Sequence, residues 1–145
     1  MPLATGKRPV VTAGYGAGPS YIRSFVENAP GVLVVDDDPS IRLLCRINLE
    51  LDGIAVEEAA NLADARARLA ETPSIGVVLL DVHVGGESGL DLLEELRRDR
   101  PYLRVGLLTG SEGADIRHAD PDAVVPKPFT LDELRGAVER LAVRR

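Results

Sequence analysis

Four short apolar stretches of this sequence each lead to a residue whose side chain can do chemistry. The first runs into two carboxylates, Asp36 and Asp37, and the others lead to Asp81, Thr109 and Lys127. The carboxyl ends of parallel strands meet at one edge of a sheet, and open α/β sheets bind ligands beyond that edge. The sequence therefore predicts that these five side chains gather in one place.

The residue types in this group favour metal and phosphoryl chemistry. Three carboxylates held together repel one another unless a cation neutralises them. Oxygen ligands without a cluster of His or Cys favour a hard ion, Mg²⁺ or Mn²⁺. A hydroxyl (Thr109) and an ammonium (Lys127) beside such an ion form a receptacle for phosphoryl oxygens. One carboxylate could itself attack phosphorus and carry an acyl phosphate.

The choice of lysine supports a special role for Lys127. Basic charge in this chain is carried almost wholly by arginine, and the only lysines are Lys7 and Lys127. A lysine ammonium is a compact charge on a flexible stem, which suits a position facing a phosphoryl group.

Alternating strands and helices are expected to position these residues. The predicted strands are 31–37, 54–58, 75–82, 104–109 and 123–125. The predicted helices are 39–51, 62–70, 89–100 and 130–145. Strand 54–58 is charged and therefore expected at a sheet edge, whereas strand 31–37 is apolar enough to be buried on both faces. This alternation predicts an α/β fold, with a parallel sheet covered by helices on both faces.

Helix 39–51 carries clear signals at both ends. Pro39 suits the first helical position, and Asp38 before it is expected to cap the helix by accepting backbone N–H groups. Gly53 is expected to end the helix. In helix 130–145, Arg144 and Arg145 are expected in the last turn, where positive charge complements the helix dipole.

Composition limits the classes of protein to consider. The chain has 145 residues, of which 45% are hydrophobic and only 3% aromatic, so we expect one domain with an aliphatic core. A net charge of −6 disfavours direct binding to nucleic acid. We expect no membrane span and no signal peptide, because no apolar run is long enough. The lone Cys45 excludes a disulfide framework and fits a reducing cytoplasm, with the thiol acting as a small apolar residue.

Residues 1–30 differ from the rest of the chain. Residues 1–19 are rich in Gly, Pro and Ala, so we expect a flexible extension. Residues 20–28 could form a short helix capped by Ser20, with Tyr21/Phe25 and Ile22/Val26 spaced four residues apart, and three of the chain's five aromatics lie in these first thirty residues. The extension is either a frayed end (or an over-long start site) or a docking segment. The domain proper is predicted at 31–145.

Four segments, in order, resemble the receiver domains of two-component response regulators. They are VLVVDDDPSIR at 32–42, LLDVHVGGESGLDLLEELR at 79–97, LLTGS at 107–111 and VVPKPF at 124–129. The resemblance covers about 31–145. It implies a flavodoxin-like (βα)5 fold, a doubly wound parallel sheet with strand order 2-1-3-4-5.

The resemblance also implies roles for the acidic residues. Asp81 would be the phospho-acceptor. Asp37 would touch the Mg²⁺ (or Mn²⁺) directly, and Asp36 would reach it through water. His83 would offer its backbone carbonyl to the metal, with its side chain pointing outward.

Further roles and partners follow from the same resemblance. Thr109 would supply the hydroxyl that closes on the phosphoryl group, and Lys127 would be the cationic partner of that group, with a cis bond to Pro128.

The phosphoryl donor would be a phosphohistidine on a sensor kinase or a histidine phosphotransfer protein. We expect a stand-alone, cytoplasmic signalling domain that binds an unknown target protein. It is not expected to be an enzyme beyond self-phosphorylation from small donors and self-dephosphorylation. The sequence leaves a homodimer open.

The sequence departs from the family pattern in the segments that carry output. Gly85-Gly86 stands where receivers usually have a proline, which predicts a more flexible loop, and Val124 replaces the usual aromatic switch residue. Pro126 removes a backbone donor from the last strand. Segment 110–122 is short, so we expect a reduced fourth helix. We interpret these changes as a phosphorylation signal that is relayed differently, through loops 83–89 and 110–122 or through the N-terminal segment. The alternative is that the switch is blunted and the domain acts mainly as a phosphoryl relay or sink.

Two other functions are alternatives to this one. Asp36-x-Asp38 resembles the nucleophile motif of haloacid dehalogenase-like phosphatases. That family needs a further acidic motif after the lysine, whereas the 18 residues after Lys127 predict one helix, and Asp81 would have no role. The second alternative is an interaction module on the same fold that does not depend on phosphorylation. The altered Val124 and Pro126 favour this alternative, and the complete acceptor site opposes it.

Overall fold

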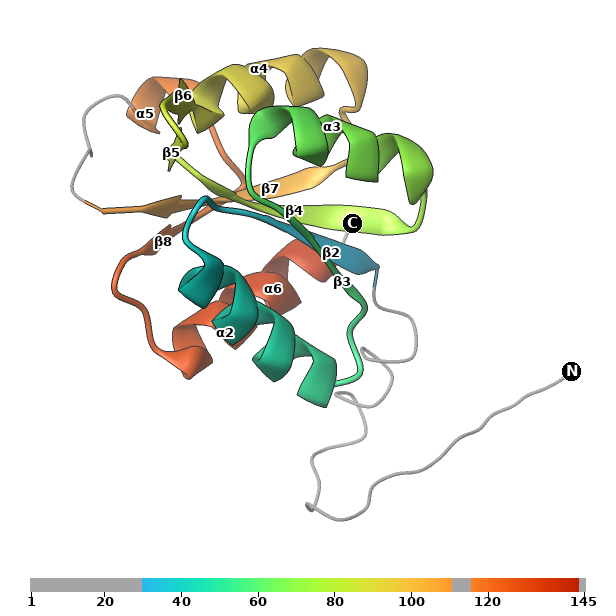
Figure 1. The fold of residues 1–145 in the computed structure, drawn as a ribbon, viewed down its shortest axis with the longest axis vertical. Helices are drawn as coiled ribbons and strands as arrows, with labels where there is room; N and C mark the ends of the chain where they lie inside the picture. Colours follow the sequence, from blue (N-terminus) through green and yellow to red (C-terminus); the bar gives the residue numbers. More distant parts are fainter. Residues whose placement is uncertain (1–29, 111–115, 144–145) are drawn as a thin grey trace, which may run out of the picture.

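The structure is a computed structural model that describes residues 30–110 and 116–143 (Figure 1). The predicted flexible extension and its short helix 20–28 lie outside the described residues, except for Pro30. Within the described ranges, the strands of the main sheet alternate with helices along the chain as predicted.

Five parallel strands form one sheet in the described part of the chain, in the order β3-β2-β4-β7-β8. Their bounds are Gly31–Val35 for β2, Val56–Ala59 for β3, Ile75–Asp81 for β4, Arg104–Thr109 for β7 and Ala123–Pro126 for β8. Counted along the chain, this order is the predicted 2-1-3-4-5. β3 lies at one edge, as its charged residues predicted. β2 and β4 lie inside the sheet, which explains their nearly continuous apolar sequences.

Helices cover both faces of this sheet (Figure 1). One face packs against α3 (Leu62–Glu71), α4 (Gly89–Asp99) and α5 (Ile116–Ala119), and the other against α2 (Pro39–Leu51) and α6 (Leu131–Ala142). Side chains of β2 alternate between two aliphatic cores, with Leu33 and Val35 on the α3 face and Val32 and Val34 on the α2 face. The doubly wound architecture and the aliphatic core are therefore confirmed. None of the described helices has both the length and the apolar character that a membrane span needs.

Both ends of α2 are built as the sequence predicted. The Asp38 side chain accepts a hydrogen bond from the backbone N–H of Ser40 at 2.8 Å, and Pro39 takes the first helical position. Gly53 follows the C-cap with φ of 83°, a conformation that glycine adopts without steric cost. Asp38 therefore has a different role from its acidic neighbours Asp36 and Asp37, whose side chains do not cap the helix.

Several predicted boundaries were wrong by a few residues. β2 ends at Val35 rather than at residue 37, and β4 ends at Asp81 rather than at 82. α6 was expected to reach residue 145, but it ends at Ala142, since Val143 has an extended backbone. Arg144 and Arg145 lie outside the described residues, and Arg140 is the basic residue in the last turn.

The predicted flexible loop after β4 contains a small antiparallel hairpin. β5 (His83–Val84) pairs with β6 (Glu87–Ser88), and Gly85 and Gly86 connect them. Both glycines have positive φ, 55° and 87°, as a two-residue type I′ turn requires. The glycine pair is therefore the turn of a hairpin, which the sequence analysis did not predict.

The last part of the sheet is modified as well. α5 spans only Ile116–Ala119, which confirms a reduced fourth helix, and residues 111–115 lie outside the described residues. Pro126 ends β8 at the sheet edge. The N–H of Lys127 points toward β7 and donates to Thr109 O at 2.7 Å. Because successive N–H groups of a strand alternate in direction, position 126 faces away from β7, so the proline removes no hydrogen bond from the sheet.

Substitutions at Asp38 test whether this residue has a different role from Asp36 and Asp37. Asp38→Ala should lower the free energy of unfolding by about 1 kcal/mol, because the cap at the start of α2 is lost. Asp38→Asn, which keeps a capping oxygen, should stay close to the parent. Urea unfolding of the three proteins measures this difference. Loss of metal binding in Asp38→Ala would contradict the assignment.

Candidate functional site

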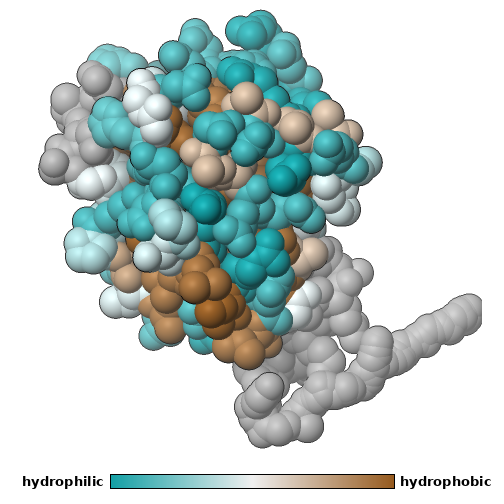
Figure 2. All heavy atoms as spheres, in the orientation of Figure 1, coloured by the Kyte–Doolittle hydropathy of each residue, from teal (hydrophilic) through white to brown (hydrophobic). Residues whose placement is uncertain are grey.

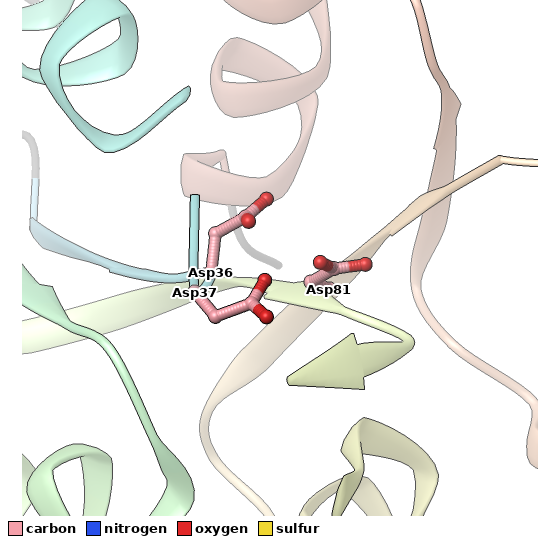
Figure 3. Close-up of side chains that lie close together, drawn as sticks. All are labelled: Asp36, Asp37 and Asp81. Atoms are coloured by element: carbon pink, nitrogen blue, oxygen red, sulfur yellow. The ribbon is translucent and has the colours of Figure 1, made fainter. Parts of the chain in front are cut away.

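The carboxylates of Asp36, Asp37 and Asp81 meet at the carboxyl ends of β2 and β4 (Figure 3). One oxygen from each lies within 4.8 Å of the other two. Val35 pairs with Leu80 in the register of β2 and β4, so the next residues, Asp36 and Asp81, lie side by side. The register of β2 on β4 therefore brings together carboxylates that are about 45 residues apart in the sequence.

Asp36 is the most firmly held of the three. It is fully buried, and its Oδ1 accepts the N–H of Asp38 at 2.9 Å while its Oδ2 accepts Lys127 Nζ at 2.8 Å. Arg42 donates to the backbone oxygen of Asp36 at 2.8 Å and also pairs with Glu58 on β3. Because Asp36 is fully buried and its two hydrogen bonds are short, its carboxylate is less open to a further ligand than those of Asp37 and Asp81.

Lys127 supplies the positive charge that this acidic cluster needs. Its Nζ lies 2.8 Å from Asp36 Oδ2 and 3.3 Å from Asp81 Oδ2, so one ammonium bridges the ends of two strands. Burial alone would lower the pKa of Lys127, but the hydrogen bond to Asp36 and the charges of Asp36 and Asp81 outweigh it and raise the pKa. The amine therefore stays protonated. The predicted cis bond between Lys127 and Pro128 is present.

Asp81 carries an unfavourable charge in this environment. Burial raises the pKa of its carboxyl above the usual value, and the negative charge of Asp36 raises it further. Lys127 and the N–H of His83, which lies 3.3 Å from Asp81 Oδ1, act in the opposite direction without cancelling the rise. Additional positive charge near Asp81 would therefore stabilise the ionised form of its carboxyl group.

Thr109 lies on the strand next to Asp81. Asp81 pairs with Leu108 in the register of β4 and β7, so Thr109 is the first residue beyond that pair. Its side chain is buried, at 5% exposure. The structure therefore brings Thr109 to the same edge as the carboxylates, as the sequence predicted.

Asp37 connects the acidic cluster to the hairpin. Its carboxylate is exposed, and its Oδ2 accepts the N–H of Gly85 at 3.1 Å. His83 at the start of the hairpin is also exposed, as expected for its side chain. The hairpin was not predicted, although a Gly-Gly pair between residues with strand propensity is a recognised hairpin signal.

Gly89 is a positioning residue that the sequence analysis did not identify. A Cβ at Gly89 would collide with the backbone carbonyl oxygen of Asp81, and the N–H of Gly89 donates to Val82 O at 2.6 Å. The start of α4 therefore packs directly on the backbone that carries Asp81. Only glycine allows this approach, and no local sequence signal distinguishes it from other glycines.

Cys45 lies outside this group of reactive side chains. It is fully buried on the inner side of α2, and burial, with a smaller contribution from Asp36, raises the pKa of its thiol to about 12. The thiol is therefore protonated and inert, which matches the predicted role as a small apolar residue.

The donor set fits a hard divalent cation. Asp37 and Asp81 each offer carboxylate oxygen at the mouth of the cluster, and the three carboxylates together exceed the charge that Lys127 can balance. Oxygen ligands of this kind suit Mg²⁺ or Mn²⁺. The cluster could hold such an ion.

Comparison with known proteins agrees with this geometry. The sequence model of the family "Response regulator receiver domain" matches residues 32–139. The transcriptional regulatory protein KdpE of Mycobacterium tuberculosis is 38% identical over 117 residues, which cover 79% of this chain and 51% of that protein. AruR of Pseudomonas aeruginosa, also a transcriptional regulatory protein, is 39% identical over 124 residues, 80% of this chain and 50% of that protein. The chain thus spans about half the length of these relatives.

Solved structures give the same result. The receiver domain of NtrX from Brucella abortus superposes with a TM-score of 0.71 at 28% sequence identity, covering 77% of this chain and 97% of that domain. A CheY-like receiver protein from Methanospirillum hungatei superposes with a TM-score of 0.72 at 26% identity, covering 78% of this chain and 93% of that one.

The raised pKa of Asp81 leads to a prediction about stability. In metal-free buffer at about pH 7, Asp81→Asn should be more stable than the parent. The folded state binds the Asp81 proton more tightly than the unfolded chain, whose pKa is about 3.9, so the parent loses stability as the pH rises above about 4. Asp81→Asn lacks this loss. The difference in free energy of unfolding between the variant and the parent should therefore grow with pH and then level off.

Urea unfolding across this pH range measures the effect, with Glu94→Gln, an exposed carboxylate on α4, as the control. A variant that is less stable than the parent at neutral pH would show that attraction to Lys127 outweighs burial and repulsion at Asp81.

Proposed function

Because this chain belongs to the receiver domain family of two-component response regulators, we propose that Asp81 accepts a phosphoryl group from a phosphohistidine donor in a Mg²⁺-dependent reaction. One oxygen of Asp81 attacks phosphorus and forms a phosphorus–oxygen bond. The phosphorus–nitrogen bond of the donor breaks, and the donor imidazole keeps the electron pair. The product is an aspartyl phosphate on Asp81.

The observation that supports this proposal most strongly is the convergence of three carboxylates and one ammonium at a single strand edge. Asp36, Asp37 and Asp81 place oxygens within 4.8 Å of one another, and Lys127 Nζ lies 3.3 Å from Asp81. Such a cluster is electrostatically costly, and burial of Asp36 makes it more so. A function that requires both a cation and an anionic group at this site accounts for that cost.

Each residue of the cluster has a distinct proposed role. Asp37 and Asp81, together with the backbone carbonyl of His83, would hold Mg²⁺, and Asp36 would act through water because its carboxylate is fully buried and tightly hydrogen-bonded. When bound, Mg²⁺ offsets the negative charge of phosphoryl oxygens that approach Asp81. Asp81 is one of these three groups and also the acceptor, and the positive charge of a bound ion would lower the raised pKa of its carboxyl.

Lys127 and Thr109 would contact the transferred group. Lys127 is already held between Asp36 and Asp81 by hydrogen bonds, so its ammonium needs little reorganisation to meet a phosphoryl oxygen on Asp81. Thr109, buried one residue beyond the partner of Asp81 on β7, would donate its hydroxyl to a second oxygen.

The wider setting of this activity is also a proposal. The donor would be a sensor histidine kinase or a histidine phosphotransfer protein in the cytoplasm, and the output would be binding to another protein. Domain limits of 31–145, with residues 1–30 as an extension, stay a prediction. Self-phosphorylation from small donors and self-dephosphorylation would be the limit of its catalysis.

Intact mass after incubation with acetyl phosphate and Mg²⁺ tests the chemistry. The parent should gain one phosphoryl group, and Asp81→Asn should gain none. Lys127→Ala should slow the gain about a hundredfold, because a cationic partner of the phosphoryl oxygens is lost. Asp38→Ala, which alters only a helix cap, is the matched control and should be modified like the parent.

The same experiment separates the alternatives. Absence of an adduct on the parent would favour the interaction module that works without phosphorylation. An adduct that persists in Asp81→Asn would overturn the assignment of Asp81, and its location on Asp36 would favour a phosphatase-like nucleophile.

The hairpin offers a route by which site occupancy reaches the surface. Asp37 accepts the N–H of Gly85, so a cation on Asp37 should change the environment of that amide. In NMR spectra, adding Mg²⁺ should shift the amide signals of Gly85 and Gly86 in the parent but not in Asp37→Asn. Shifts of Gly85 that are equally large in Asp37→Asn would contradict this route.

A further inference from the structure

One side of α2 presents apolar side chains to the surface. Leu43, Leu44, Ile47 and Leu51 are 54%, 37%, 49% and 72% exposed. Leu43, Ile47 and Leu51 are four residues apart and Leu44 lies three before Ile47, so they share one side of the helix, which we call the α2 stripe. Figure 2 shows apolar residues gathered over α2 on the lower half of the molecule.

Polar neighbours do not shield the α2 stripe in the described part of the chain. Arg42 and Arg46 turn toward β3, where both pair with Glu58. The Asn48 side chain bonds to Leu44 O on its own helix. Four neighbouring exposed apolar side chains on a single helix are typical of a surface that is covered by something else.

The undescribed N-terminal segment joins the domain beside this stripe. The N–H of Gly31 donates to Ser74 O at 2.9 Å, and the N–H of Val32 donates to Ala55 O at 2.9 Å. Ala55 follows Leu51 by only four residues. Residues 1–29 therefore join β2 at the same end of the sheet as the C-terminal end of α2.

The sequence of this segment is complementary to the stripe. In a helix at 20–28, the spacing would place Tyr21, Ile22, Phe25 and Val26 on one side, and the segment holds two of the five aromatics in a chain whose described core is aliphatic. A nine-residue helix is about 13 Å long, and the stripe from Leu43 to Leu51 spans about 12 Å. The two lengths match.

We propose that residues 20–28 form a helix that packs its apolar face on the α2 stripe of the same chain. Only residues 29 and 30 separate this helix from Gly31, so its C-terminal end must lie near Leu51 and Tyr21 near Leu43. Such a short tether gives a local concentration of about a millimolar or more, which makes a small apolar contact sufficient for docking. The inference does not depend on the phosphorylation chemistry.

Tryptophan fluorescence of the full chain tests this docking, because the native sequence has no tryptophan. In Phe25→Trp, the emission maximum should be blue-shifted and acrylamide quenching weak. Adding Ile47→Glu together with Leu51→Glu should shift the emission to the red and restore quenching. The control, Phe25→Trp with Val124→Glu, carries a charge on the opposite face of the sheet from α2 and should keep the blue-shifted emission.

Three results would overturn the proposal. Red-shifted, fully quenched emission in Phe25→Trp itself would show that the segment is not docked, and the α2 stripe would then be a site for a separate partner protein. Emission unaffected by the α2 substitutions would place the segment elsewhere. A shift that disappears on dilution would assign the contact to a second copy of the chain. Circular dichroism checks the fold, and Ile47→Ser with Leu51→Ser is the milder pair should the charged pair unfold.

Discussion

The whole functional edge depends on one ammonium among three carboxylates. Lys127 Nζ binds Asp36 and Asp81 at the same time, and it can do so because its backbone is fixed to Thr109 on the neighbouring strand. Without that charge, burial of Asp36 beside Asp81 would oppose the pairing of β2 with β4. The site and the centre of the sheet are therefore stabilised by the same interaction, and the remaining excess of negative charge is what makes the site receptive to a cation.

Much of this arrangement could be predicted from the sequence, for physical reasons. Apolar stretches that end in Asp36, Asp81 and Thr109 specify buried parallel strands and their polar ends, and four ordered motifs specified the family. Asp38 and Gly53 are local signals, so the ends of α2 were predicted correctly. The ends of the strands were predicted less accurately, because an aspartate can either continue a strand or terminate it, depending on the contacts that its side chain makes.

Other features depend on contacts between distant segments and could not be predicted. The close approach of Gly89 to Asp81 O exists only once α4 has packed on β4. The bond from Gly85 to Asp37 joins residues 48 apart in the sequence. The hairpin itself was predictable from the glycine pair, but the prediction considered the freedom of glycine and not the specific turn that two positive φ angles build.

Pro126 has a consequence for how other molecules can contact the β8 edge. An exposed edge strand normally offers a row of free N–H and C=O groups on which a further strand can assemble. At position 126 the outward-facing group is a proline ring, so that row lacks a donor where it passes closest to Lys127. A further strand would therefore find one donor fewer at this end of β8, which disfavours extension of the sheet beside the site.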